Sequence, residues 1–332
     1  STIKFCNRNR RKITKLGLML VKQTQNMGLK SLLLSSGYKN IDSNTISFGV
    51  APRINACGRM GHADEALKLF LAKDIYEVNR LTQLLNDYNK IRQEKEKSIY
   101  EEAIKQIEEK QLFNKNAIIV GGENWHHGVI GIVSSKITDL YFKPSILLCY
   151  EDDFAKGSGR SIPGFDLHDA LMKCQDSIER FGGHAMAIGI TIKKENFEKF
   201  SEEVEKIAED AKINEIIPII NIDAKIDLNE ISKEMVQSLK QLEPFGEGNK
   251  TPIFAFKNLK IDSIRSLTEG KHIKMTLKDG NTIIDAIGFN LGCLADEYRI
   301  GDKIDVVGSL EINSFNGIDS LQINLKDVMK SI

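Results

Sequence analysis

The spacing of apolar residues divides the first third of the chain into two helical regions. Over residues 1–72 apolar residues recur at helical spacing, as at Ile13, Leu16 and Leu20, which predicts helices joined by loops. Residues 74–110 contain neither glycine nor proline, and their apolar positions form a helical stripe. They predict one helix of about 50 Å, at 1.5 Å per residue. We interpret it as a connector between two globular parts.

A second pattern begins near residue 117. Two continuous apolar runs, 117–122 and 145–150, flank a helical pattern at 129–140. Strand, helix, strand is typical of a parallel α/β layer. Further helices are predicted at 63–71, 166–173 and 194–211, and an apolar strand at 188–192.

From residue 216 onward the pattern alternates between apolar and polar positions with a period of two. It predicts short strands at 219–226, 253–256, 272–277, 282–289, 303–310 and 320–325. Turns at 278–281 and 315–317 separate several of them. Five or so antiparallel strands in this length favour a small closed barrel. The OB-fold is the common barrel that binds single nucleic-acid strands, and an SH3-like barrel is the alternative.

Composition and charge narrow the class of protein. With 332 residues the chain exceeds the length that one core normally serves, so we expect two or three domains. Lys plus Arg and Asp plus Glu both number 46, and the net charge is zero. No global field attracts nucleic acid or membrane, so a polyanion site must be a local patch.

The spacing of the five cysteines and the length of the apolar runs indicate the cellular compartment and whether the protein associates with a membrane. The cysteines are widely separated and form no Cys-x-x-Cys pair, which argues against a disulfide framework and against a zinc site. A reducing cytoplasm fits this usage best. No apolar run approaches the roughly 20 residues that span a bilayer, and the first residues have no apolar signal core. We therefore expect no membrane association.

Two segments before residue 130 carry candidate chemistry. Arg53, Asn55 and Arg59 stand among small residues, and guanidinium groups suit phosphate because each donates two parallel hydrogen bonds. Helix capping or pairing with carboxylates is the alternative. The segment 123–128 holds Trp125 and His126 after a predicted strand, where ligands of α/β sheets gather. Core packing of the tryptophan and a helix-terminal histidine are the alternative there.

Two glycine-containing segments follow. Residues 157–164 predict a glycine-spaced loop whose Ser158, Arg160 and Ser161 form a phosphate cradle. Residues 181–187 place Gly182, Gly183 and His184 before a strand. Paired glycines bare a turn so that an anion approaches the backbone, and the histidine adds a donor. A tight turn with an ordinary hydrogen-bonded histidine is the alternative.

The predicted barrel also offers contacts for a nucleic-acid strand. Residues 242–249 form its expected entry loop. A stacking and charged surface is predicted from Phe245, Phe254, Phe256, Lys271, His272 and Lys274. Most aromatic residues on strands are core, so we expect two of the three phenylalanines to be buried.

Five motifs in one order give the chain a specific resemblance. They are Pro-Arg-Ile-Asn-Ala-Cys-Gly-Arg at 52–59, Trp-His-His-Gly-Val-Ile-Gly-Ile-Val at 125–133, Gly-Ser-Gly-Arg-Ser-Ile at 157–162, Phe-Gly-Gly-His-Ala-Met-Ala at 181–187 and Leu-Glu-Pro-Phe-Gly-Glu-Gly-Asn at 242–249. From Lys12 on, the chain closely resembles the bacterial RecJ family of single-strand-specific DNA exonucleases. That family belongs to the DHH phosphoesterase superfamily.

The resemblance implies an α/β multidomain fold. Its parts would be the tail of a DHH domain at 1–73, a connector helix at 74–111, an α/β DHHA1 domain at 112–214 and a β-barrel OB-fold at 215–332. It implies a 5′ to 3′ exonuclease of DNA repair and recombination that uses Mn²⁺ or Mg²⁺. Implied partners are single-stranded DNA with a 5′-phosphorylated end, a single-strand-binding protein and a helicase.

The resemblance also assigns roles to residues. Ser158 and Arg160 look like ligands of the 5′-phosphate. Arg53, Asn55, Arg59, His126, Gly182, Gly183 and His184 are similar to residues that face the metal centre. The catalytic residues themselves stay unassigned.

The chain departs from the family pattern in its first part. It contains no Asp-His-His triplet and no aspartate before Asp42, and a basic run at 8–12 reads as a solvated arm. Two-metal hydrolysis needs several carboxylate oxygens. We therefore expect a truncated DHH domain that binds no metal through the residues present. Such a chain would grip single strands without cleaving them.

Two other functions stay open. One is a phosphodiesterase for short oligonucleotides or cyclic dinucleotides, although a dinucleotide needs no barrel to track a strand. The other is a non-catalytic module that binds single-stranded DNA.

Overall fold

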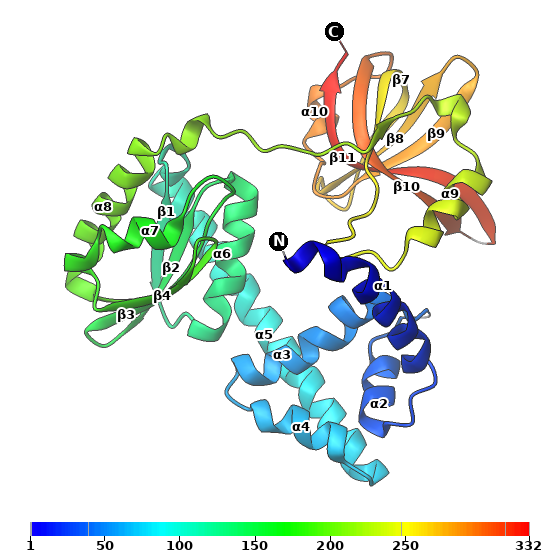
Figure 1. Ribbon diagram of the computed structural model, residues 1–332. Coiled ribbons are helices and arrows are strands. Elements are labelled where there is room, and N and C mark those ends of the chain that lie inside the picture. Colours follow the sequence, from blue (N-terminus) through cyan, green and yellow to red (C-terminus); the bar gives the residue numbers. More distant parts are fainter. Residues whose placement is uncertain (1, 39, 247, 316, 332) are drawn as a thin grey trace. The chain divides into compact units, whose positions relative to one another are not determined.

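The computed structural model describes residues 2–38, 40–246, 248–315 and 317–331. The chain forms two compact units (Figure 1): one comprises residues 24–218, and the other residues 1–23 together with 219–332. Glu247 of the 242–249 motif and Asn316 of the predicted 315–317 turn lie outside the described residues. Among the described residues, no helix is long and apolar enough to cross a bilayer.

The 24–218 unit begins with a helical part. Its elements are α2 (Met27–Ser35), the π-helix η1 (Thr45–Val50), α3 (Ala51–Arg59), α4 (Ala63–Leu71) and α5 (Ile75–Glu109). The side chain of Asp74 caps α5 by accepting a hydrogen bond from the backbone N–H of Glu77. The first half of α5 buries Val78, Leu81 and Leu85 in this part. The predicted helices at 63–71 and 74–110 are confirmed.

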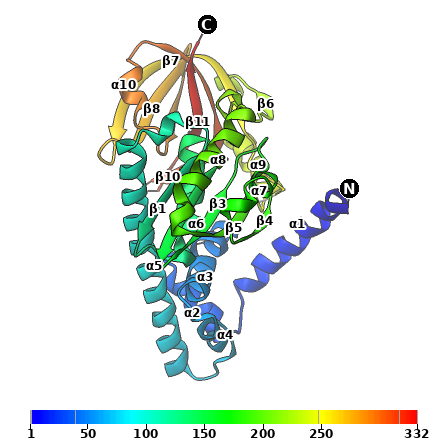
Figure 2. The same cartoon turned by 90° about the vertical axis from the view of Figure 1, so that its left-hand side faces the viewer.

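The second half of α5 packs against the sheet of the same unit. Ile99, Ala103 and Ile107 join a core with the first strand and helix α6. At 35 residues, α5 is about 52 Å long, and Figure 2 shows it running from the α2–α4 region to the sheet. The helix therefore connects two parts of one compact unit.

The sheet has five strands in the order β1-β2-β3-β5-β4. The pair β1–β2 is parallel, and the other pairs are antiparallel. Helix α6 covers one face, and α7 and α8 pack on the other (Figure 1). The bounds are β1 (Ile118–Glu123), α6 (His127–Tyr141), β2 (Ser145–Glu151), β3 (Phe154–Arg160), α7 (Leu167–Met172), β4 (Arg180–His184), β5 (Ala187–Lys193) and α8 (Phe197–Asp210).

Two glycine-rich segments lie partly in strands, so the predicted loop is wrong for residues 157–160 and the predicted turn for 182–184, whereas residues 161–164 are irregular as predicted. Residues 157–160 lie in β3, and residues 182–184 lie in β4. A Cβ at Gly157 would lie 2.6 Å from the Ile190 side chain, and a Cβ at Gly159 would lie 2.8 Å from Ile188. These two glycines are required because core side chains occupy the space beside the strand.

The other unit contains a closed five-stranded barrel. Its strands are β7 (Phe254–Leu267), β8 (His272–Asp279), β9 (Thr282–Gly288), β10 (Lys303–Phe315) and β11 (Ile318–Lys330). The order β7-β8-β9-β11-β10 closes because β10 also pairs with β7. The pair β9–β11 is parallel, in contrast to the all-antiparallel expectation. Short elements complete the unit: β6 (Ala224–Lys225), α9 (Lys233–Leu239) and α10 (Leu294–Glu297).

Two predictions for this unit need correction. Only 224–225 of the expected strand 219–226 is a strand, since Ile219 and Ile222 are exposed and have no packed face to alternate against. Strands β10 and β11 extend beyond 303–310 and 320–325 because they pair with each other along their length. The basic run at 8–12 lies in helix α1 (Thr2–Val21).

Candidate functional site

Three rows of residues cross one face of the sheet in register. Strand pairing places Lys156, Thr191 and Arg180 in one row. The next row contains Ser158, Gly189 and Gly182, and the third contains Arg160, Ala187 and His184. Because alternate residues of a strand point to the same side, β3 directs Lys156, Ser158 and Arg160 away from the α7–α8 core.

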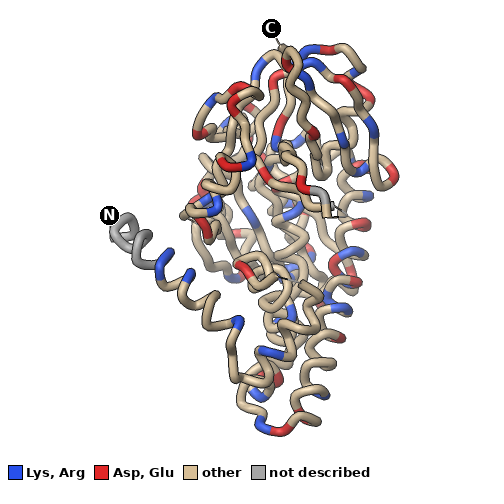
Figure 3. Tube along the Cα trace, turned by 90° about the vertical axis from the view of Figure 1, so that its right-hand side faces the viewer, with Lys and Arg blue, Asp and Glu red and all other residues tan. Residues whose placement is uncertain are grey.

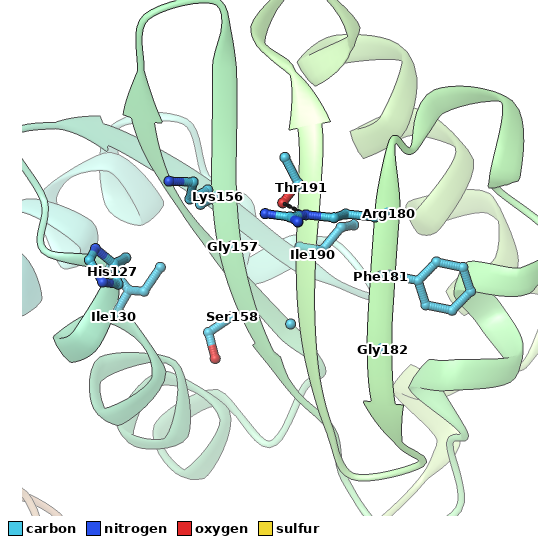
Figure 4. Close-up of a pocket in the computed structure, with 11 residues that line it drawn as sticks. His127, Ile130, Lys156, Gly157, Ser158, Arg180, Phe181, Gly182, Ile190 and Thr191 are labelled. Atoms are coloured by element: carbon cyan, nitrogen blue, oxygen red, sulfur yellow. Dashed lines mark hydrogen bonds between the residues drawn. The ribbon is translucent and has the colours of Figure 1, made fainter. Parts of the chain in front are cut away.

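Part of this face is hollowed into a pocket of about 490 Å³ (Figure 4). We call it the sheet pocket. The small residues of β4 and β5 form its floor, and His127 and Ile130 of α6 form one side. Its lining comprises His127, Ile130, Lys156, Gly157, Ser158, Arg180, Phe181, Gly182, Gly189, Ile190 and Thr191.

A second cluster lies beside the N-terminus of α6, and we call Arg59, His126, Ser158 and Arg160 the anchor cluster. Arg59 at the end of α3 donates a hydrogen bond from Nη1 to the carbonyl of Gly128 at 2.8 Å. A Cβ on Gly128 would lie 2.4 Å from the Arg59 carbonyl oxygen. The glycine therefore permits close contact between α3 and α6.

Ser158 and Arg160 complete the anchor cluster from strand β3. Arg160 donates from Nη1 to Ser158 Oγ at 3.2 Å and to the Gly159 carbonyl at 2.8 Å. A Cβ on Gly131 of α6 would lie 2.8 Å from Ser158 Oγ and 3.2 Å from Arg160 Nη2. The first turns of α6 thus pass directly over these two side chains.

The charge of the anchor cluster is not neutralised by nearby carboxylates. Burial and the charge of Arg59 lower the pKa of Arg160. In the part of the chain that the structure describes, neither arginine forms an ion pair. Two neighbouring cations beside a helix N-terminus are an arrangement that favours a bound anion. Charges of both signs are interspersed along the trace of the sheet and barrel regions (Figure 3).

His126 caps helix α6 in its neutral form. Its Nδ1 accepts a hydrogen bond from the backbone N–H of Gly128 at 3.1 Å, and its ring stacks on His127 with centroids 5.1 Å apart. Burial first, and then the positive charges of His127 and Lys95, lower the pKa of His126, while Glu151 acts in the opposite direction. Protonation of Nδ1 would remove the cap.

This gives a pH-dependent prediction for stability. The pKa of His126 is lower in the folded chain than its ordinary value of about 6.5. At pH values between these two pKa values, the unfolded chain therefore binds more protons than the folded chain. The free energy of unfolding therefore falls as pH drops below about 6.5. His126→Asn keeps a capping side chain that does not titrate. Thermal melts from about pH 7 to about pH 5.5 should show a smaller decrease in melting temperature for this variant than for the unsubstituted chain. Equal decreases for the two proteins would contradict the role of His126.

Several residues predicted for the site have other structural partners. Arg53 donates to Asn86 Oδ1 at 2.6 Å, to the Ser35 carbonyl at 3.2 Å and to the Gly49 carbonyl. It therefore ties α3 to α2, η1 and α5. Ser161 is buried and donates to the Phe165 carbonyl at 2.7 Å. The Ser161 hydroxyl would have to break this bond to donate to a phosphate, whereas Arg53 uses three of its five N–H donors in joining helices.

Other predicted residues stay accessible. Asn55 and His184 are exposed, on α3 and at the end of β4. Gly182 lines the sheet pocket, whereas Gly183 lies against the backbone of β5.

The barrel residues separate into core and surface. Phe254 and Phe256 are buried, as expected for two of the three phenylalanines, and Phe245 is half-buried. Lys274 pairs with Asp285 at 2.8 Å, and Lys271 is exposed. His272 packs edge-to-face on Phe289, which is 53% exposed.

The outer face of β7 and β8 carries two basic pairs, of which only Lys274 was predicted from the sequence. Arg265 lies opposite Lys274, and Lys260 lies opposite Lys278. With Phe289, this face combines cations and an accessible ring, the two components that bind single strands.

Sequence analysis also missed four residues of the sheet pocket: His127, Lys156, Arg180 and Thr191. A signal for one of them was present, because Lys156 alternates with Ser158 and Arg160 as residues on one face of a strand do. The signal was lost when 157–164 was interpreted as a loop.

The described residues do not form a site for a divalent metal. They contain no group of three or more His, Cys, Asp or Glu side chains placed to hold an ion. Mn²⁺ and Mg²⁺ prefer several carboxylate or carbonyl oxygens, and the anchor cluster consists of cations, a histidine and a hydroxyl.

Comparisons with known proteins agree on the two domains. Residues 114–210 match the DHHA1 domain family, and residues 222–327 match the RecJ OB domain family. The single-stranded-DNA-specific exonuclease RecJ of Bacillus subtilis is 35% identical over 327 residues, which cover 97% of this chain and 42% of that protein. The RecJ of Haemophilus influenzae is 31% identical over 96% of this chain and 58% of that protein.

Solved structures give the same result. The crystal structure of RecJ with Mn²⁺ from Thermus thermophilus superposes with a TM-score of 0.84 at 28% identity, covering 97% of this chain and 47% of that one. Its complex with Mg²⁺ gives a TM-score of 0.79 at 27% identity, covering 95% and 48%. This chain spans about half the length of the relatives it matches.

A DHHA1 domain together with an OB barrel defines a protein of the DHH and DHHA1 phosphoesterase superfamily. The anchor cluster and the sheet pocket lie within the residues of the DHHA1 match and at the adjacent end of α3. The chain belongs to the RecJ family, whose curated members are named single-stranded-DNA-specific exonucleases.

Proposed function

We propose that this chain binds single-stranded DNA by its 5′-phosphorylated end, as the substrate-holding part of a RecJ-type 5′ to 3′ exonuclease of DNA repair and recombination. The observation that carries the proposal is the anchor cluster. Arg59 and Arg160 form no ion pair with a carboxylate of the described residues, they lie beside the N-terminus of α6, and Ser158 adds a hydroxyl. Guanidinium groups and helix N-termini bind phosphate, and a terminal phosphate has more charge than a bridging one.

In this proposal each group has a distinct task. Arg160 and Arg59 contribute charge, Ser158 donates its hydroxyl hydrogen to a phosphate oxygen, and the N-terminal turn of α6 contributes backbone dipoles. Arg160 is held for this task by its bonds to Ser158 and Gly159. Anchoring the terminal phosphate fixes which end of the strand is held, and this defines the polarity of an exonuclease.

The OB barrel is proposed to bind the strand that follows. Its support is the basic outer face of β7 and β8 and the exposed ring of Phe289. Lys271, His272 and Phe245 remain proposed contacts, and the pairing of Lys274 with Asp285 weakens its claim to a phosphate.

The proposal also includes the domain bounds, the lack of cleavage by the chain alone, its location and its protein partners. It divides the chain into a DHH tail at 1–73, a connector at 74–111, a DHHA1 domain at 112–214 and an OB-fold at 215–332. By itself the chain would bind strands without cleaving them, because hydrolysis in this superfamily requires clustered metal ligands. A cytoplasmic location, a single-strand-binding protein and a helicase as partners belong to the same proposal.

A binding experiment tests the function directly. The affinity of the chain for a labelled single-stranded DNA is measured with a 5′-phosphate and with a 5′-hydroxyl, each over a salt series. We expect tighter binding of the phosphorylated strand and a salt slope that corresponds to a few contacted phosphates. Equal affinity for the two ends would overturn the proposal. The same mixtures, incubated with Mn²⁺, report whether the strand is shortened.

Replacement of Arg160 assigns the preference to the anchor cluster. Arg160→Gln removes one charge-assisted contact, so the affinity for the 5′-phosphorylated strand should fall about tenfold, and that for the 5′-hydroxyl strand less than about threefold. Arg80→Gln, on the exposed surface of α5, is the matched control and should leave both affinities unchanged. Equal losses for the two strands would remove Arg160 from the phosphate site.

A further inference from the structure

The sheet pocket continues past the anchor cluster. Ser158 lines the pocket and also accepts the hydrogen bond of Arg160, whereas Arg160 itself does not line it. From Ser158 the floor runs across Gly189 and Gly182 to the row of Lys156, Thr191 and Arg180 (Figure 4). An anion held at Ser158 therefore stands at one end of an open space.

The far row of this space carries a cation without a carboxylate partner. Arg180 donates from Nε to Thr191 Oγ1 at 3.3 Å, and it forms no ion pair with any described residue. Lys156 is paired with Glu151 at 2.5 Å, and Glu151 also lies 3.8 Å from His127. Glu151 thus compensates Lys156 and leaves the positive charge of Arg180 unbalanced.

The floor of the pocket provides room. A Cβ at Gly182 would meet no atom within 4 Å, and a Cβ at Gly189 would only touch the Gly182 carbonyl at 4.0 Å. These glycines differ from Gly157 and Gly159, where core side chains occupy the space that a Cβ would fill. Packing does not require glycine at 182 or 189, and the bare backbone leaves the surface open to a ligand.

The pocket exposes both polar and apolar surface, and its charged and hydroxyl-bearing side chains are His127, Lys156, Ser158, Arg180 and Thr191. Ile130 and Ile190 are 1% and 4% exposed and serve the core. The Phe181 ring lies 5.4 Å from the His168 ring and packs against the α7–α8 side. A phosphoryl group in this pocket would find Arg180, Lys156 and the Thr191 hydroxyl.

We propose that the sheet pocket binds the additional phosphoryl groups of a polyphosphorylated 5′ end, such as a 5′-triphosphate. This inference rests on the proposed function, because it requires the first phosphate to lie at Ser158 and Arg160. Residues two apart in a strand are separated by about 7 Å. One or two further phosphoryl groups would bring the ligand from Ser158 to Lys156 and Arg180.

The test compares four single strands of one sequence. They carry a 5′-hydroxyl, a 5′-monophosphate, a 5′-triphosphate, or a 5′-monophosphate with a second phosphate at the 3′ end, which adds charge away from the pocket. We expect the triphosphate strand to bind about tenfold more tightly than the monophosphate strand, as two added charge-assisted contacts allow. The 3′-phosphate should add less than about twofold.

The outcomes separate the two proposals. If the hydroxyl and monophosphate strands bind equally, the proposed function fails, and this site fails with it. If the monophosphate is preferred but the triphosphate gives no further gain, only the sheet pocket is overturned.

Arg180→Gln assigns the gain to the pocket. It should abolish the preference for triphosphate over monophosphate and keep the preference for monophosphate over hydroxyl. The matched control Arg80→Gln should keep both preferences. Lys156 is unsuitable for this test because its removal would leave Glu151 facing the ligand. A triphosphate preference that persists in Arg180→Gln would overturn the proposal.

Discussion

Replacement of Gly183 by alanine should destabilise the DHHA1 domain by about 3 kcal/mol. The residue has a φ of +144°, a conformation that residues with a side chain rarely adopt. A Cβ there would lie 2.3 Å from the Ala187 carbonyl oxygen and 2.8 Å from the Ile188 Cα. Both are backbone atoms of β5, so the clash is relieved only if the pairing of β4 with β5 is disrupted.

The neighbouring glycine provides a matched control. Gly182→Ala places its Cβ in open space, so stability should change by less than about 0.5 kcal/mol. Because the chain has two compact units, hydrogen exchange at the β4 and β5 amides is the appropriate measurement. Loss of protection in both variants, or in neither, would contradict this account of Gly183.

Loss of the Glu96 carboxylate should cost about 2 kcal/mol. Glu96 on α5 is 7% exposed; it accepts a hydrogen bond from Arg92 of the same helix and forms an ion pair with Lys136 of α6 at 2.6 Å. Arg92 also donates to Asn89 Oδ1 at 2.7 Å. In Glu96→Gln the buried guanidinium of Arg92 and the ammonium of Lys136 would both lose the carboxylate that they contact. The expected cost is at the low end for a buried pair because Lys136 is half exposed and turns to water.

A double-mutant cycle distinguishes the ion pair from simple packing. Arg92→Met in the Glu96→Gln background removes the uncompensated buried charge, so part of the lost stability should return. The measurement is urea unfolding with hydrogen exchange of α5 and α6 as the local readout. If the losses from the two single substitutions simply add, the pair does not clamp α5 to α6.

Periodicity predicted most elements of the fold because the residues that pack are local in sequence. The stripe from Val78 to Ile107 identified α5, and the runs at 117–122 and 145–150 identified the parallel strands. The glycine segments were misinterpreted because a glycine can either leave the backbone open to a ligand or make room for a neighbouring core side chain. At Gly157 and Gly159 it makes room for Ile190 and Ile188, and a sequence does not show which side chains cross over a strand.

Residues of the candidate site were predicted only where neighbouring residues in the sequence form a recognisable motif. Ser158 and Arg160 came from the motif at 157–162, and the structure places them together beside Arg59. Lys156, Thr191 and Arg180 come together through the registers of three strands, which no local pattern specifies. Arg53 shows the converse, since its motif suggested a ligand role while its hydrogen bonds join helices.

Trp125 is the only tryptophan of the chain, and it precedes His126 of the anchor cluster. Its indole is 5% exposed, lies against Gly122, and donates from Nε1 to Glu102 of α5 at 2.7 Å. The molecule therefore has one indole fluorophore, placed where α5 meets the first turn of α6. A red shift of its emission will mark separation of α5 from the start of α6, because the buried indole would then be exposed to water.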